Sequence, residues 1–355
     1  MLKFSVTILT LFFTGYALLA SAQDVGTASS SINLNISSDN LDYYLLQAFA
    51  AEQPQKRLRL NHIGLTAIQD ETGFIVSSLL DGYPAHVAGL RSGDRLEKVN
   101  GIPFHPLWSF NSQEDMTDGF IPNRTAHRIE FDRNGTQQSI SIVPVFENLY
   151  DSYRSATLNS AQEINSGNKV IGYLKLWSVS RSTNDLISFK RVIDSLSHCD
   201  GLILDLRDSY GFINAEHLDR FFPSRNSYFD LTSAISGVWS AGTTSHLSDD
   251  YYGKAIVVIQ NKGTRGGMEL FGYQLSKLQR VISLGENTEG RLGNITVDNL
   301  NNEVSYQADA YTTVDGLLIE SVGLAPEQRV AFSLDESRAV DPQLEAAVST
   351  LLTIM

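Results

Sequence analysis

The cysteine and the histidines are the side chains best suited to nucleophilic or metal chemistry, but their spacing in the chain supports neither. Cys199 is the only cysteine, so no intramolecular disulfide can form. No group of cysteines and histidines has the spacing of a zinc site, so we expect no metal and no cofactor. A serine could be paired with His217 or His246, but no spacing singles out such a pair. Packing or solvated histidines and a buried free thiol are the simpler interpretation.

The composition is that of an acidic globular protein. The chain has 355 residues, of which 42% are hydrophobic and 19% charged, and this length favours two domains. Its 27 Lys and Arg against 40 Asp and Glu give a net charge of -13. Such a surface repels phosphate backbones and anionic lipid headgroups, so we expect no nucleic-acid partner.

The N-terminal residues have the pattern of an export signal. Lys3 precedes an apolar run, Phe4 to Ala20, and small residues follow at Ala20 to Ala22. We therefore expect residues 1–22 to be a cleaved signal peptide and the mature chain to be periplasmic or secreted, with no membrane span. An uncleaved anchor is the alternative, although the run is short for a span and contains several hydroxyl residues.

Residues 23–60 are predicted to be a linker followed by a helix. The segment from Gln23 to Ser38 is rich in Ser, Asn and Thr, which favours a flexible lead-in. Apolar residues then recur at helical spacing between Asp39 and Glu52, with Asp39 as the N-cap and Pro54 ending the run.

Residues 61–145 resemble a PDZ domain. Short strands separated by turns begin at Asn61, and a hairpin with an Asn134-Gly135 turn closes the region. Between them, the segment Asp81 to Gly101 follows the PDZ pattern almost without departure: Pro84-Ala85, Ala88-Gly89-Leu90, Gly93-Asp94 and Asn100-Gly101. The resemblance implies that a peptide's terminal carboxylate binds at His62, Ile63, Gly64 and Leu65, assisted by Arg57 or Arg59. A PDZ fold kept as a spacer, without a ligand, is the alternative.

Residues 146–355 alternate between strand and helix patterns. Val170 to Leu176 is predicted to be a strand. Gly201 to Arg207 and Lys254 to Gln260 are nearly continuous apolar runs, typical of strands covered on both faces. Helical spacing follows at Thr183 to Leu196 and at Met268 to Leu278. This alternation predicts an α/β core with helices on a sheet.

Four segments of this region resemble the C-terminal-processing, or tail-specific, serine peptidases, in the order in which that family has them. They are Gly201 to Gly211, Asn261 to Glu269, Gly285 to Gly290, and Asp315 to Pro326 with Asp341 to Glu345. The resemblance implies an α/β fold: a PDZ β-sandwich or barrel-like domain followed by a tail-specific protease core of the crotonase-like ββα type. It also implies a serine-type peptidase whose substrates are protein C-termini.

The residues that the family uses for catalysis are replaced here. Its nucleophilic serine aligns with Gly266, which has no oxygen or sulfur to attack a carbonyl. Its general-base lysine aligns with Arg291, which stays protonated and accepts no proton. Its oxyanion turn aligns with Gly211 and Phe212, where Phe212 replaces a glycine.

Two functions are consistent with these replacements. The first is an exported pseudo-peptidase that binds protein C-termini or unfolded peptides through its PDZ domain, with an active peptidase relative as one possible partner. The second is an active serine endopeptidase with an unconventional nucleophile. The nearest hydroxyls to Gly266 are those of Thr264 and Ser276, two and ten residues away, and neither spacing suits the role.

Overall fold

The computed structural model describes residues 33–116, 119–233, 237–242, 250–298, 301–307, 313–335 and 339–355. All of them belong to one compact unit that runs from Ser31 to Met355. The predicted signal peptide and the start of the predicted linker lie outside the described residues. Within those residues, every helix is too short or too polar to cross a lipid bilayer.

The region that resembles a PDZ domain is built on an antiparallel sheet with the order β3-β4-β5-β7-β8, to which β6 adds beside β5. The strands are β3 (Leu65–Asp70), β4 (Gly73–Leu79), β5 (Arg95–Val99), β6 (Ile102–Pro103), β7 (His127–Arg133) and β8 (Thr136–Ile142). The Asn134-Gly135 turn joins β7 to β8, with positive φ at both residues, as a two-residue hairpin requires. A short helix, α2 (Pro84–Val87), packs through the fully buried Ala85 against the core of this sheet.

The second large sheet lies in the region predicted to be α/β. Its order is β10-β11-β13-β17-β18-β23, and all neighbours from β11 onward run parallel. The strands are β10 (Gln162–Ser166), β11 (Lys169–Lys175), β13 (Gly201–Asp205), β17 (Ile256–Gln260), β18 (Val281–Gly285) and β23 (Gln328–Arg329). Every residue of β13 and β17 is buried, as the continuous apolar runs predict.

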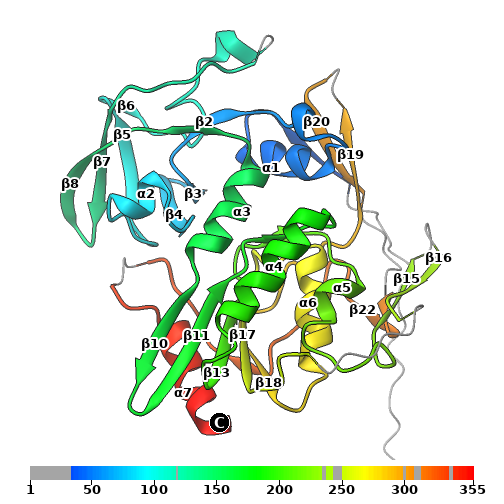
Figure 1. The fold of residues 1–355 in the computed structure, drawn as a ribbon. Coiled ribbons are helices and arrows are strands. Elements are labelled where there is room, and N and C mark those ends of the chain that lie inside the picture. Colours follow the sequence, from blue (N-terminus) through cyan, green and yellow to red (C-terminus); the bar gives the residue numbers. More distant parts are fainter. Residues whose placement is uncertain are drawn as a thin grey trace, which may run out of the picture. The chain divides into compact units, whose positions relative to one another are not determined.

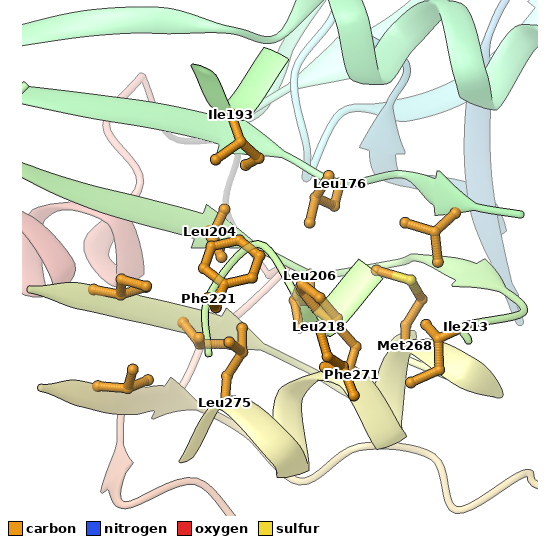
Figure 2. Packing of buried hydrophobic residues seen from close by; sticks show 14 of the residues in the cluster. Leu176, Ile193, Leu204, Leu206, Ile213, Leu218, Phe221, Met268, Phe271 and Leu275 are labelled. Carbon is orange, nitrogen blue, oxygen red and sulfur yellow. The ribbon is translucent and has the colours of Figure 1, made fainter. Parts of the chain in front are cut away.

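Helices cover both faces of this sheet (Figure 1). Because side chains alternate along a strand, Leu202 and Leu204 of β13 point to one face, while Ile203 points to the other. The first face packs against α4 (Thr183–Ser195), α5 (Ala215–Leu218) and α6 (Gly267–Ser276), and the second against α7 (Pro342–Ile354). Figure 2 shows part of the first layer, with Leu204 and Leu206 beside Phe221 and Phe271.

The N-terminal segment differs in part from the prediction. The lead-in is not wholly irregular, because β1 (Asn33–Ser37) pairs antiparallel with β20 (Glu303–Gln307), which also pairs with β19 (Asn294–Asp298). The predicted helix is present as α1 (Leu41–Ala50). Its N-cap is Asn40 rather than Asp39, and the Asn40 side chain accepts a hydrogen bond from the Asp42 N–H at 2.9 Å.

The remaining elements connect these layers. The pair β2 (Leu60–His62) and β9 (Val145–Glu147) spans the predicted boundary at residue 145 and leads directly into α3 (Leu149–Asn159). The others are short: β12 (Ser178–Val179), β14 (Tyr210–Gly211), β15 (Asp230–Ser233), β16 (Gly237–Ser240), β21 (Thr313–Val314), β22 (Leu317–Leu318), and the 3₁₀ turns η1 (Pro54–Lys56) and η2 (Gln113–Met116). The pair β12–β14 matters most for the site, because β14 lies against the start of α6.

Candidate functional site

Gly266, the position predicted for the nucleophile, is the N-cap of α6. Its backbone has φ 64° and ψ -136°, a conformation that L side chains rarely adopt. A Cβ at this residue would lie 3.3 Å from both the Gly211 carbonyl oxygen and Cε2 of Tyr210. The backbone therefore holds residue 266 in a strained turn against β14, and a hydrogen fits there without strain.

The two nearby hydroxyls considered as substitutes are used elsewhere. The Thr264 hydroxyl is buried and donates to the Leu206 carbonyl oxygen at 2.8 Å, which fixes the loop before α6. The Ser276 hydroxyl donates to the Tyr273 carbonyl oxygen at the far end of the helix. Neither hydroxyl belongs to the lining of the space around Gly266.

Arg291, the position predicted for the general base, contacts Gly266 through its backbone. The Gly266 N–H donates to the Arg291 carbonyl oxygen at 3.1 Å. The guanidinium group forms a 2.7 Å ion pair with Glu289 and lies 5.8 Å from the centre of the Tyr306 ring. A guanidinium group bound to a carboxylate has no lone pair with which to accept a proton.

At the predicted oxyanion turn, the N–H of Phe212 is engaged within the protein. The Phe212 N–H donates to the Val179 carbonyl oxygen at 3.0 Å, continuing the short β12–β14 ladder. Gly211 fits only because it has no side chain, since a Cβ there would lie 2.1 Å from the Val179 carbonyl oxygen. The Phe212 ring packs at 6.4 Å from Phe49 and 5.8 Å from Tyr210. The N–H of Phe212 in the predicted oxyanion turn, and the N–H of the neighbouring Gly266, thus both donate to acceptors within the protein.

A largely apolar cleft of about 750 Å³ surrounds these positions. It is lined by Ile36, Leu46, Phe49, Ala50, Arg181, Tyr210, Phe212, Ile213, Leu231, Val238, Arg265, Gly266, Gly267, Leu270, Arg291, Leu292, Gly293, Ile295 and Tyr306. Among these described residues there is no serine, threonine, cysteine, lysine or histidine. The two hydroxyls are phenols, and burial raises the pKa of both Tyr210 and Tyr306.

Glu269 is a buried carboxylate that sequence reasoning did not single out. Its two oxygens accept hydrogen bonds from the Thr288 hydroxyl at 2.6 Å and from three backbone N–H groups, those of Gly266, Gly290 and Arg291, at 3.1, 2.7 and 2.9 Å. Burial raises the pKa of Glu269 to about 7, although these hydrogen bonds oppose the rise. A glutamate three residues after a helix N-cap is the capping-box pattern, which was the available signal in the sequence.

Arg265 ties the turn before α6 to the N-terminal helix. Its guanidinium group binds Asp42 of α1 through two hydrogen bonds of 2.6 Å each. The Arg265 side chain is 13% exposed and that of Asp42 is 30% exposed. Although burial acts to raise the pKa of Asp42, the charge and hydrogen bonds of Arg265 lower it. The bidentate pair fixes the position of α1 over the turn.

The other chemically capable residues lie outside the cleft. His217 is buried, and burial lowers its pKa to about 4, while its Nδ1 accepts the Asn214 N–H at 3.2 Å. His246 lies outside the described residues. Arg207 binds Asp205 and, at 2.7 Å, Asp341 at the N-cap of α7, in keeping with a structural role.

The predicted peptide-binding loop is closed in this structure. His62, Ile63 and Leu65 are buried, and the Gly64 N–H donates to Nδ1 of His62 at 3.1 Å. The His62 ring stacks on Tyr83 at 5.7 Å, and burial lowers the pKa of His62 to about 4. A neutral histidine thus occupies one of the donors that a carboxylate would use.

The two arginines expected to assist that loop point to other groups. Arg57 lies 3.4 Å from the centre of the Tyr150 ring and 3.7 Å from Asp151. Arg59 donates to the Phe146 carbonyl oxygen at 2.7 Å. Both guanidinium groups therefore fasten the chain before β2 to β9 and α3.

Comparison with known proteins identifies the α/β region. Residues 170–330 match peptidase family S41. The chain carries a peptidase family S41 domain. A carboxyl-terminal-processing peptidase 2 of Arabidopsis thaliana, described as chloroplastic, is 23% identical over 287 residues, which cover 74% of this chain and 51% of the relative. A carboxyl-terminal-processing protease of Synechocystis is 25% identical over 250 residues, covering 65% and 53%. The chain thus spans about half the length of these curated relatives.

A solved structure supports the fold. An S41 protease structure from Bacteroides fragilis aligns with a TM-score of 0.55 and 15% identity, covering 83% of this chain and 84% of the other. The mixed α/β architecture of the S41 fold is therefore present in this chain. The resemblance to C-terminal-processing peptidases is confirmed at the level of the family.

The ion pair between Asp42 and Arg265 gives a first prediction. Asp42→Ala removes the carboxylate that pairs with the guanidinium group of Arg265, a side chain that is only 13% exposed. The free energy of unfolding, measured by urea titration, should therefore fall by about 2 to 3 kcal/mol. The control Asp39→Ala removes an exposed carboxylate just before the same helix and should change the free energy of unfolding by about 0.5 kcal/mol or less. Equal losses in the two variants would contradict a role for the pair.

The second prediction concerns the pH dependence of stability. The pKa of Glu269 rises on folding from 4.5 to about 7, so the folded state binds the proton more tightly. Its contribution to stability is therefore complete below about pH 4.5 and is lost as pH rises through 7. Glu269→Gln should flatten the decline of the unfolding free energy across this window, whereas exposed Glu52→Gln should not. An unchanged pH profile in Glu269→Gln would rule out this titration.

Proposed function

We propose that this chain is a proteolytically inactive S41 homologue that binds protein C-termini or unfolded peptides. The proposal rests on the lining of the cleft around Gly266, in which the described residues include no serine, threonine, cysteine, lysine or histidine. Peptide-bond hydrolysis by the serine mechanism needs a nucleophilic oxygen and a group that removes its proton. Gly266 and Arg291 supply neither.

The surroundings of Gly266 strengthen the argument. A carbonyl seated there would need free N–H donors, but those of Gly266 and Phe212 are held by Arg291, Glu269 and Val179. Loss of a nucleophile alone typically lowers turnover by about a million-fold, and donors held within the protein remove much of what would remain.

Binding is supported by the surfaces that remain. The cleft combines apolar walls with the guanidinium of Arg181, which is exposed and lies 5.6 Å from the Phe212 ring. In the region that resembles a PDZ domain, β3 is the edge strand of its sheet, so an extended peptide can add beside it. The terminal carboxylate would then replace His62 as the acceptor of the Gly64 N–H.

The location and partners follow from the same proposal. The signal-peptide pattern of residues 1–22 supports export to the periplasm or out of the cell. The named relatives act as carboxyl-terminal-processing enzymes, which supports protein C-termini as the ligand class. An active peptidase relative is a reasonable partner for a chain that binds such termini without cutting them.

The alternative is an active serine endopeptidase with an unconventional nucleophile. It is favoured by the retained fold and by the pre-formed turn at Gly266, whose strained φ and ψ would present a side chain to the cleft. The alternative includes a chain that is a Gly266 variant of an active enzyme, and in that case Gly266→Ser alone would give a labelled, active protein.

The third prediction separates these functions. Gly266→Ser should give no fluorophosphonate labelling and no cleavage of an unfolded protein substrate, because Arg291 cannot take the serine proton. It should also lower the free energy of unfolding by about 1 to 3 kcal/mol, because its Cβ meets Gly211 and Tyr210 at a strained backbone position.

Two further variants complete that experiment. Gly293→Ser is the matched control, because Gly293 lines the same cleft without a positive φ. The double variant Gly266→Ser with Arg291→Lys tests whether both the nucleophile hydroxyl and the proton-accepting lysine must be restored before labelling and turnover occur. Labelling and turnover in Gly266→Ser alone would favour the active alternative.

The fourth prediction concerns peptide binding. A fluorescent peptide with a free C-terminal carboxylate should bind at least about tenfold more tightly than its amidated form, as measured by anisotropy. Ile68→Lys, on the edge strand β3, should weaken binding, whereas Ile102→Lys on β6 should not, although both isoleucines are exposed. Equal affinity for the free and amidated peptides would exclude capture of the terminal carboxylate.

A further inference from the structure

A second cluster of chemically capable side chains lies far along the sheet from the cleft. Glu163 on β10 and the pair His198 and Cys199, in the loop before β13, bring together a carboxylate, an imidazole and a thiol. Nε2 of His198 lies 3.0 Å from a Glu163 oxygen and 3.8 Å from the Cys199 sulfur. All three ligand atoms lie within 4.8 Å of one another.

The strand order explains how these residues meet. β11 lies between β10 and β13, and Glu163 is the register partner of Gly172 on β11. A Cβ on Gly172 would lie 3.4 Å from the Cys199 sulfur and 3.2 Å from Cβ of Leu196. The missing side chain at Gly172 thus leaves room for the thiol beneath the histidine.

The geometry does not suit a cysteine nucleophile activated by histidine. In such a relay, one ring nitrogen takes the thiol proton and the other is oriented by the carboxylate. Here the Glu163 oxygen and the Cys199 sulfur both face the same nitrogen, Nε2.

Three different donors that converge on one point are instead what a borderline-soft cation needs. Zinc binds thiolate, imidazole and carboxylate at about 2.0 to 2.3 Å, which sets neighbouring tetrahedral ligands about 3.3 to 3.8 Å apart. The observed separations of 3.0 and 3.8 Å are close to this range. A cation at this point would take the place of the direct contact between Glu163 and His198.

The site is open on one side and held firmly on the other. The side chains of Glu163 and His198 are 49% and 59% exposed, so solvent can supply a fourth ligand. Lys254 donates to the carbonyl oxygens of Ser197 and Cys199 at 2.9 and 2.6 Å, which fixes the loop that carries two of the three donors. The positive charge of Lys254 is directed at these backbone carbonyls.

We propose that Glu163, His198 and Cys199 bind one zinc ion, with water as the fourth ligand. The sequence predicts no metal because the cysteine and histidines have no zinc spacing among themselves. The carboxylate comes from a strand 35 residues earlier, which only the β10-β11-β13 arrangement brings into place.

The single cysteine makes a direct spectroscopic test possible. Cobalt(II) titrated into the metal-free, reduced protein should produce a sulfur-to-cobalt charge-transfer band that saturates at about one equivalent and disappears when zinc is added. Any such band reports Cys199, because the chain contains no other thiol. Cys199→Ser should abolish it.

Variants of the other two donors give the second arm of the test. Glu163→Gln and His198→Asn should each weaken cobalt binding by about tenfold or more, and both residues are exposed, so folding should be retained. The matched controls Glu71→Gln and His86→Asn replace exposed residues far from the cluster in sequence and should bind as the wild type does. Absence of the band in the wild type, or unchanged affinity in both donor variants, would overturn the proposal.

Discussion

The buried carboxylate of Glu269 holds together the backbone from which the cleft is built. It accepts hydrogen bonds from the start of its own helix, at Gly266, and from the loop after β18, at Thr288, Gly290 and Arg291. A buried carboxylate is tolerated only when such donors compensate for its lost hydration. The two segments that carry the predicted nucleophile and base positions are therefore locked to each other through one side chain.

Through Glu269, the turn at the head of α6 keeps a fixed geometry, although the position proposed for the nucleophile carries no side-chain oxygen or sulfur. Residue 266 has a φ and ψ that L side chains rarely adopt at the head of α6, and a Cβ there would lie against the Gly211 carbonyl oxygen and the Tyr210 ring. The side chain itself is a hydrogen, and the N–H groups of Gly266 and Phe212 donate to acceptors within the protein. Apolar walls and an exposed arginine remain, which are features of a surface that binds.

Much of the fold could be predicted from local pattern. The runs at residues 201–207 and 254–260 are apolar almost throughout, and such runs form strands covered on both faces; β13 and β17 confirm this. The sequence analysis did not predict β1, although Leu34 and Ile36 alternate with polar residues, because Ser, Asn and Thr dominate the surrounding segment and the partner strand, β20, lies about 270 residues away. Its pairing is a property of the tertiary fold, which no local pattern encodes.

The candidate site shows the same division between local and distant information. The replacements that we propose at Gly266, Arg291 and Phe212 are predictions from the sequence, because each residue lies in or beside a segment that resembles the family. The partners that decide their chemistry cannot be read in this way, since the Asp42 that holds Arg265 is 223 residues away. The carboxylate of Glu163 reaches His198 only through the order of three strands.

Intact-mass spectrometry of the wild-type mature protein, after prolonged incubation with a fluorophosphonate and a denatured substrate protein, tests the central claim most directly. The account predicts that the chain keeps its unmodified mass and that the substrate stays whole. A stoichiometric adduct on a residue lining the cleft, together with time-dependent substrate cleavage that is lost when this residue is replaced, would contradict it.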